Sequence, residues 1–339
     1  MADATSVVGQ VLWHAHRYDP VHDAFQFRPI PRDLHRSVTF LTDEYLPAGD
    51  PPIVVKRVEA MAAAPKPAPL HFIFHSAFCC STLLARAFDR PGVSMGLKEP
   101  LVFNDLSGWK HRGGKPADIA RVLDSALTLL ARPFAPGEAV IVKPSNIIAP
   151  LIAVTLAMRP GSRALLLEAP LRTYLSSVAK KEMTGRLWVR DLLVKLLKDG
   201  LIDLGFEPED FLGQTDLQVA AVGWLAQHAL FAKLAAQYPD RVRTLDSETL
   251  LARPTEAMTA LAALYGLPLD TVAIADIVAG PAFTRHSKHG TEFGSDARAA
   301  EYRDAAAVHA DEIEKAAVWA EAVARTAGVP MILPVPLLI

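Results

Sequence analysis

The sequence predicts an α/β fold in which a parallel sheet carries helices on both faces, giving three layers. Two observations support this class. From residue 70 onward, short apolar runs of strand length alternate with longer segments of helical pattern, and parallel strands need such crossover connections. The runs are also apolar along most of their length, as expected for strands that are buried on both faces.

The expected strands follow one another from a stiff connector. Residues 64–69 alternate proline with other residues and form an extended lead into the first strand. Each strand is a short apolar run bounded by polar or turn residues. We expect strands at 70–75, 93–95, 139–143, 163–167 and 241–245.

Helices are expected between and after these strands. Ser81 and Thr82 open the first helix, and the apolar run 147–158 contains Pro150 and ends before Arg159 and Pro160. Helical patterns dominate most of the carboxyl-terminal half. The expected helices are 81–89, 117–131, 147–158, a helix from 171, a largely helical stretch 187–238, a helix from 254, and 295–327.

The bulk composition limits the classes of function. The 339 residues carry a formal net charge of −2, which argues against a nucleic-acid partner and means that any anionic ligand is held by local groups. Residues 1–10 do not resemble a signal peptide, and the apolar runs are too short to span a bilayer. Two adjacent cysteines favour a reducing, cytoplasmic setting. No HExxH or CxxC pattern predicts a metal site.

We expect two parts along the chain. Residues 1–65 are rich in histidine, arginine, proline and aromatic residues with weak periodicity, and they are interpreted as an N-terminal extension packed on the core. Residues 66–330 form the α/β domain. The oligomeric state stays open.

Polar residues follow each predicted strand where it ends. The carboxyl ends of parallel strands share one edge of a sheet, and ligands of open α/β sheets bind there. A loop followed by Ser81 and Thr82 at a helix start also offers backbone N–H groups to an anion. The residues expected at this edge are Ser76, Ser81, Thr82, Lys98, Glu99, Lys143, Ser145, Asn146, Glu168 and Arg172.

The order of these motifs resembles the sulfotransferases that use 3′-phosphoadenosine 5′-phosphosulfate (PAPS), which have a P-loop NTPase-like architecture. Residues 77–84, Ala-Phe-Cys-Cys-Ser-Thr-Leu-Leu, stand where that family has Pro-Lys/Arg-Ser-Gly-Thr-Thr-x-Leu. Residues 142–146 resemble its Lys-x-Pro-x-Asn strand end, residues 163–176 its strand, Arg-Asp-Pro-Arg-Asp and serine pattern, and residues 244–254 its Tyr-Glu-Asp-Leu-x-x-x-Pro segment. The likeness covers residues 70–325.

The sequence departs from that family at three positions. Phe78 replaces the basic residue of the loop, Cys80 replaces its glycine, and Glu168 replaces the arginine that holds the 3′-phosphate of the nucleotide. A carboxylate at this last position repels a phosphate unless a cation intervenes. Arg172 is expected either to pair with Glu168 or to reach the phosphate. Arg285 and Lys288 stand where the family places a basic phosphate clamp.

The resemblance implies transfer of a sulfuryl group from PAPS to a hydroxyl or amine of a small molecule or glycan, without a metal. Lys143 is expected to stabilise the leaving phosphate and Glu99 to accept the proton. The donor-binding residues implied are Ser76, Phe78, Cys79, Cys80, Ser81, Thr82, Arg172, Ser176, Arg285 and Lys288.

Other interpretations of the same residues stay open. Ser81 and Thr82 also suit ordinary helix N-caps, and Glu99 suits the first turn of a helix. Glu168 is more typical of a structural ion pair, Trp224 of the core, and Cys79 and Cys80 of small buried side chains. A nucleotide-binding kinase, disfavoured because the loop has no lysine, and a non-catalytic descendant of the fold are the alternative functions.

Overall fold

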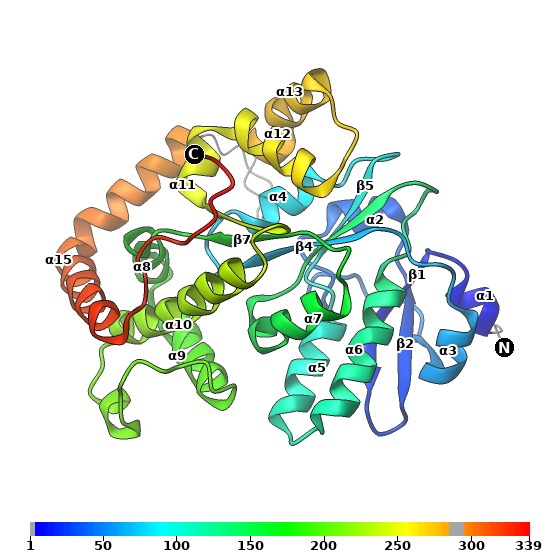
Figure 1. Cartoon of the computed structure of the whole chain (residues 1–339), viewed down its shortest axis with the longest axis horizontal. Helices are drawn as coiled ribbons and strands as arrows, with labels where there is room; N and C mark the ends of the chain where they lie inside the picture. Colours follow the sequence, from blue (N-terminus) through cyan, green and yellow to red (C-terminus); the bar gives the residue numbers. More distant parts are fainter. Residues whose placement is uncertain (1–3, 285–294) are drawn as a thin grey trace. The chain divides into compact units, whose positions relative to one another are not determined.

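The α/β class is confirmed by a five-stranded sheet flanked by helices (Figure 1). The structure is a computed structural model that describes residues 4–284 and 295–339, with the backbone alone for Ala4 and residues 295–307. The strand order is β5-β6-β4-β7-β8, and β6 pairs in parallel with both β4 and β5. The strands are β4 (Leu70–His75), β5 (Ser94–Lys98), β6 (Ala139–Lys143), β7 (Ala164–Glu168) and β8 (Val242–Asp246).

The chain forms two compact units. Unit 1 consists of Met1–Phe74, Thr82–Ala164 and Ala262–Ile277, and unit 2 consists of His75–Ser81, Leu165–Leu261 and Val278–Ile339. Residues 1–65 therefore belong to the same unit as β5 and β6.

Two strands, β4 and β6, have the bounds that the sequence predicted. The prediction for the second strand was wrong at its end, because β5 continues past Gly96 to Lys98. A glycine weakens a strand interior, yet here it allows close packing. A Cβ at position 96 would lie 2.1 Å from the carbonyl oxygen of Ala85 in α4 (Ser81–Ala87). Gly96 therefore lets the helix backbone rest directly on the strand.

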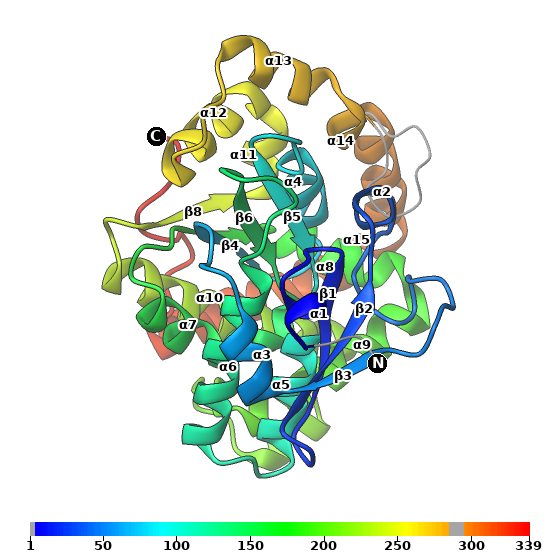
Figure 2. The same ribbon diagram turned by 90° about the vertical axis from the view of Figure 1, so that its right-hand side faces the viewer.

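The N-terminal segment contains a sheet that the sequence pattern did not predict. β1 (Trp13–Asp19), β2 (Ala24–Pro29) and β3 (Ile53–Lys56) pair in antiparallel order (Figure 2). His14 and His16 are buried in β1. Buried histidines count as polar in a hydropathy pattern, so the alternation of this strand was hidden.

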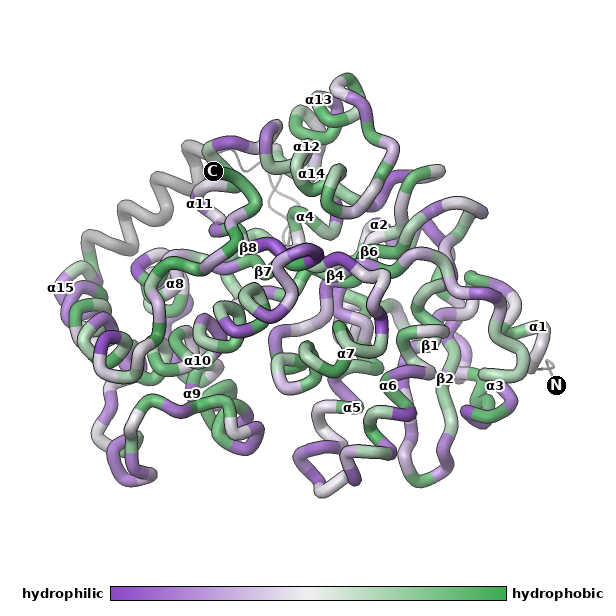
Figure 3. Tube along the Cα trace, in the orientation of Figure 1, coloured by the Kyte–Doolittle hydropathy of each residue, from purple (hydrophilic) through white to green (hydrophobic). Residues whose placement is uncertain are grey.

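The helices of unit 1 lie beside its strands. α5 (Val102–His111) was not predicted, and it packs against α6 (Pro116–Leu130). The turn between them, residues 112–115, is hydrophilic, whereas α13 (Thr271–Ala279) is apolar over most of its length (Figure 3). The remaining helices of unit 1 are α1 (Ala4–Val8), α2 (Arg32–Ser37), α3 (Arg57–Ala63) and α7 (Ile152–Met158). The division between the units falls inside α12 (Pro254–Tyr265).

The predicted helix 147–158 is two elements. A 3₁₀ helix, η1 (Asn146–Leu151), contains Pro150, and α7 follows it. Proline has no N–H and clashes with the preceding turn of an α-helix, so the α-helix begins only after Pro150.

Unit 2 is built around α8 (Leu171–Lys180), α9 (Glu182–Lys198), α10 (Asp216–Gln237) and α15 (Ser295–Ala327), which pack on one another. Short helices complete it: η2 (Pro208–Leu212), α11 (Ser247–Ala252) and α14 (Pro281–Thr284). The carboxyl-terminal segment extends the pairing of β8, because Thr244 donates to the Val335 carbonyl and Leu337 donates back to Thr244.

α10 is the one described helix whose length and composition are compatible with a membrane span. Of the most apolar stretch of this helix, 78% is buried inside the protein. This burial is typical of a core helix. Trp224 in this helix is buried, as predicted.

Candidate functional site

The loop between β4 and α4 adopts a backbone that usually requires glycine. Ala77 has φ 74°, Phe78 has φ 53° and Cys80 has φ 64°. A side chain in this left-handed region costs about 1–2 kcal/mol per residue, and such residues concentrate at functional sites. Cys80, which replaces the glycine expected from the resemblance, therefore keeps the conformation of a glycine.

Aromatic packing in unit 2 holds this loop. The ring of Phe78 lies 5.6 Å from that of Tyr174 in α8 and 5.2 Å from that of Trp188 in α9. The Lys181 ammonium lies 5.9 Å from the same ring. Phe78, which we expected to bind the donor, thus anchors the loop to the α8–α9 corner through its side chain.

The other loop residues are mostly enclosed. Cys79, Ser81 and Thr82 are buried, and Cys80 is partly exposed. Both thiols are free of disulfides. The hydroxyl of Ser76 accepts from the Ala169 N–H at 3.4 Å, and its own N–H donates to Leu167 at 3.1 Å. Ser76 therefore connects the end of β4 with the residue after β7.

The strained loop gives a first prediction. Cys80→Gly should leave the free energy of unfolding unchanged or raise it by up to about 1 kcal/mol, because relief of the left-handed strain outweighs the entropy of glycine. Cys80→Val should lower it by roughly 2 kcal/mol, since a β-branched residue is strongly disfavoured at positive φ.

Urea unfolding of the two variants measures these changes, and Cys79→Gly is the matched control. Cys79 is buried and is not among the residues of positive φ. A glycine there should destabilise the protein. Equal losses for glycine at positions 79 and 80 would contradict the assignment of strain to Cys80.

The two predicted catalytic residues meet in unit 1. Lys143 ends β6, Glu99 follows β5, and the Lys143 ammonium donates to the Glu99 carboxylate. The pair lies where two parallel neighbours end, because Lys98 is directly opposite Lys143 in the β5–β6 register. Glu99 has φ 53°, so it does not belong to the first turn of a helix, as the alternative interpretation required. The prediction that strand ends bring these side chains together is confirmed for this pair.

The surroundings of Lys143 are apolar and tight. Its side chain is 2% exposed and that of Glu99 is 17% exposed. The ammonium also lies 4.8 Å from the ring centre of Phe40. A buried lysine beside an aromatic face and one carboxylate is poorly hydrated, so its charge acts strongly on nearby groups.

Lys98, unlike Lys143, forms hydrogen bonds to backbone carbonyls of the N-terminal segment. Its ammonium donates to the carbonyls of Arg36 at 3.0 Å and Val38 at 2.7 Å, and its own carbonyl accepts from Leu41. Burial, together with the charge of Arg86, lowers the pKa of Lys98 to about 7. Lys98 therefore fastens the N-terminal segment to the end of β5, which brings Phe40 onto Lys143.

Glu168, at the end of β7, lies in a polar pair, as its interpretation as a structural ion-pair partner expected, but the partner was not predicted. Its Oε2 lies 2.5 Å from Nδ1 of His228 in α10. Burial raises the pKa of the Glu168 carboxyl, the bond from His228 opposes this shift, and the charge of Asp246 adds to it. The sequence signal was a lone histidine, one turn after Trp224, in a largely apolar helix.

The expected pairing of Arg172 with Glu168 is wrong. Arg172 binds Glu314 at 2.8 Å and Glu321 at 2.7 Å, both in α15, and its side chain is 47% exposed. These bonds raise the pKa of its guanidinium. Glu168 precedes α8 on a strand, so the spacing of four residues does not place the two side chains on one helix face.

Ser176 lies in α8 with its hydroxyl buried and without a hydrogen-bond partner. A buried hydroxyl without a partner is costly and calls for a ligand or another explanation. The two cations of the expected phosphate clamp, Arg285 and Lys288, lie outside the described residues.

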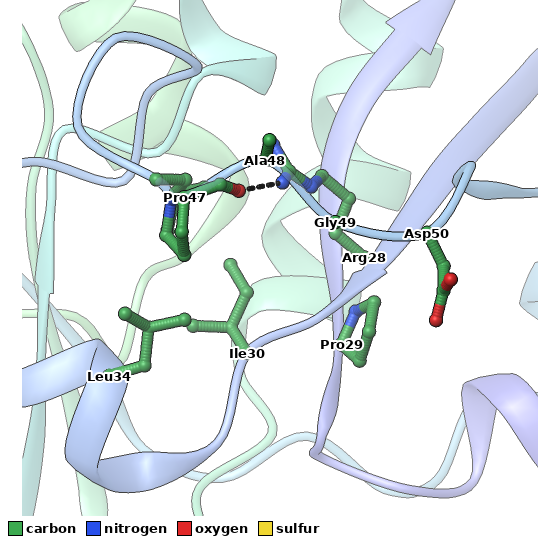
Figure 4. A pocket seen from close by; sticks show the side chains of 9 residues that line it. Arg28, Pro29, Ile30, Leu34, Pro47, Ala48, Gly49 and Asp50 are labelled. Atoms are coloured by element: carbon green, nitrogen blue, oxygen red, sulfur yellow. Dashed lines mark hydrogen bonds between the residues drawn. The ribbon is translucent and has the colours of Figure 1, made fainter.

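A small pocket in unit 1 does not include any candidate residue (Figure 4). It lies among β2, the start of α2 and the loop that follows, where Arg28 donates to the Pro47 carbonyl at 2.9 Å. Its lining is Arg28, Pro29, Ile30, Leu34, Leu46, Pro47, Ala48, Gly49 and Asp50. Within the described part of the chain, no group of three or more histidine, cysteine or acidic side chains is placed to hold a metal ion.

Comparisons with known proteins give a likeness of fold. No protein-family model matches the sequence, and no curated protein is similar to it. Among solved structures, the chain is similar to the "Sulfotransferase Domain from the Curacin Biosynthetic Pathway", with 14% identity and a TM-score of 0.42. The match covers 73% of this chain and 99% of that domain. A likeness this distant says nothing of chemistry, which has to come from the residues themselves.

Proposed function

We propose that this protein is a sulfotransferase with the three-layer P-loop-like architecture, and that it uses PAPS as donor and a hydroxyl or amine of a small molecule or glycan as acceptor. The observation that carries the proposal is the loop after β4, where three non-glycine residues hold positive φ angles. Such a backbone turns successive N–H groups toward one side, which suits a phosphate or sulfate group.

One group that lacks a hydrogen-bond partner supports the fit of an anionic donor. The Ser176 hydroxyl is buried and unpaired, and a phosphate oxygen is the kind of acceptor that satisfies it. The donor, when bound, supplies a sulfuryl group activated by its link to a phosphate.

The roles of the residues in unit 1 follow from their chemistry. Glu99 accepts the proton that the attacking hydroxyl or amine loses, which general base catalysis requires. Lys143 places a poorly hydrated positive charge where negative charge develops on the leaving phosphate. Their contact holds the Glu99 carboxylate beside the Lys143 ammonium at the ends of β5 and β6.

Ligand-dependent stability tests the proposal. Adenosine 3′,5′-bisphosphate at 100 times its dissociation constant should raise the free energy of unfolding by about 2.7 kcal/mol, because it binds only the folded state. Thermal unfolding with bisphosphate is compared with adenosine 5′-monophosphate and with ATP and magnesium.

The control ligands separate the alternative functions. A larger effect of ATP and magnesium than of the bisphosphate would support the kinase instead. Absence of any stabilisation, together with no transfer of labelled sulfate from PAPS to an acceptor mixture, would refute the sulfotransferase assignment.

A further inference from the structure

Helix α9 in unit 2 is apolar on two sides. On its inner side, Leu192 and Leu196 are buried and pack against Ala226 of α10. Its outer side carries four further apolar residues, which are between 41% and 68% exposed: Met183, Leu187, Val194 and Leu197. A helix that is apolar all round is normally covered on every side. The outer side of α9 is therefore suited to a partner that covers it.

The spacing on the outer side is that of a contact between two helices. The residues that form this row, at intervals of four, three, four and three, are Met183, Leu187, Arg190, Val194 and Leu197. We call this row the α9 seam. Such strict spacing gives the narrow stripe along which the helices of a coiled coil pack, whereas a helix that covers a protein core has a broader apolar face. The α9 seam is therefore shaped to receive one other helix.

The order of residues in the α9 seam is nearly symmetric about its centre. Met183 lies seven residues before Arg190, and Leu197 lies seven residues after it. Between them, Leu187 and Val194 lie three residues before and four residues after the same arginine. If two copies pack antiparallel about a two-fold axis through this centre, apolar side chains meet apolar side chains at both ends.

The centre of the α9 seam carries two neighbouring charges of opposite sign. The side chains of Arg190 and Asp191 are both exposed. Within the chain, Arg190 binds Asp216 at 2.6 Å and Asp191 binds Lys195, so each charge keeps a counter-ion when it is covered. Antiparallel packing brings Arg190 of one copy beside Asp191 of the other, and the two-fold axis repeats this pair. This charge complementarity favours a second copy of the chain as the partner.

We propose that the protein forms a two-fold dimer in which α9 of one copy packs antiparallel on α9 of the other along the α9 seam. Leu212 in η2 adds exposed apolar surface beside the seam, because the carbonyl of nearby Gln214 accepts from Arg190 at 3.3 Å. A seam of about 15 residues is about 22 Å long. This length makes a small interface, so we expect a dissociation constant of roughly 10 µM.

Sedimentation of the full chain over a concentration series measures the dimer. Wild type should pass from monomer to dimer between about 1 µM and about 100 µM. Val194→Asp should weaken the dimer about 100-fold, because the two-fold axis buries an unpaired carboxylate twice. The matched control is Val318→Asp in α15, since Val318 is 51% exposed and Val194 is 49% exposed. The control should dimerise as wild type does.

The charges at the centre of the seam give a second test. Arg190→Asp and Asp191→Arg should each weaken self-association about tenfold, since each places like charges across the axis. An equal mixture of the two variants should associate about as strongly as wild type, because each chain then meets opposite charges. Mixing does not restore the bonds to Asp216 and Lys195 within each chain, so recovery in the mixture reports the contact between copies.

Thermal unfolding of each variant shows whether it is folded, and if Val194→Asp is not, the mixture of charge variants decides. A wild-type chain that stays monomeric at about 100 µM would overturn the inference. So would a Val194→Asp dimer as tight as that of wild type, an equal loss in Val318→Asp, or a mixture that associates no better than its components. Sulfuryl transfer plays no part in these measurements, so the dimer and the proposed function stand or fall separately.

Discussion

Lys143→Met should lower the rate of sulfuryl transfer by about 10²–10³-fold, which is the usual cost of removing one group that stabilises charge in a transition state. The lysine is nearly inaccessible and its ammonium has two neighbours, Glu99 and the ring of Phe40. Glu99→Gln should lower the rate by about 10²–10⁴-fold through loss of the proton acceptor. Initial rates with labelled PAPS measure both.

Stability separates a catalytic pair from a structural one. Breaking a buried ion pair costs about 3–5 kcal/mol, whereas replacing both partners by uncharged groups is often close to neutral. The double variant Lys143→Met, Glu99→Gln should therefore recover much of the stability that Lys143→Met loses. Its activity should not recover. Activity that survives both single changes would place the chemistry at other residues.

Acid should destabilise the protein strongly through His35. Both ring nitrogens of His35 are buried without partners. Burial, together with the charges of Lys98 and Arg32, lowers the pKa of His35 to about 3. Because the folded pKa lies below the unfolded value of 6.5, the unfolded chain takes up the proton first. Stability is therefore complete above pH 6.5 and is lost as the pH falls toward 3.

The expected loss of unfolding free energy is large for a single residue. Between pH 6.5 and pH 4, His35 should remove roughly 3 kcal/mol of unfolding free energy. His35→Leu should be more stable than wild type at pH 4 and should flatten the dependence on pH, as measured by urea unfolding from pH 7.5 to pH 4. The exposed His22, changed to leucine, is the control. Parallel curves for His35→Leu and wild type would contradict this prediction.

Patterns in the sequence predicted the central strands better than the parts around them. Apart from His71 in β4, β4 and β6 are apolar up to the charged or polar residues that end them, so their bounds follow from local composition. In the small N-terminal sheet, which was missed, His14 and His16 take two of the buried positions of β1 and hide its apolar pattern. Local pattern also cannot show that Lys98 is satisfied by the carbonyls of Arg36 and Val38, which lie 62 and 60 residues away.

In the candidate site, too, some contacts follow from local sequence and others depend on residues far apart in the chain. The meeting of Glu99 and Lys143 follows from their places at the ends of neighbouring strands. The partners of Arg172 lie 142 and 149 residues away, and His228 lies 60 residues from Glu168. Packing of helices in unit 2 decides these pairs, and a single sequence does not contain that information in local form.

The anchoring of Phe78 has a consequence for any attempt to move or redesign the loop. Its backbone conformation depends on Tyr174 and Trp188, which come from helices about 100 residues later in the chain. The loop and the α8–α9 corner therefore form one exchangeable module. A graft of the loop alone onto a related scaffold would lose its shape, and changes at Phe78 and Trp188 would have to be made together.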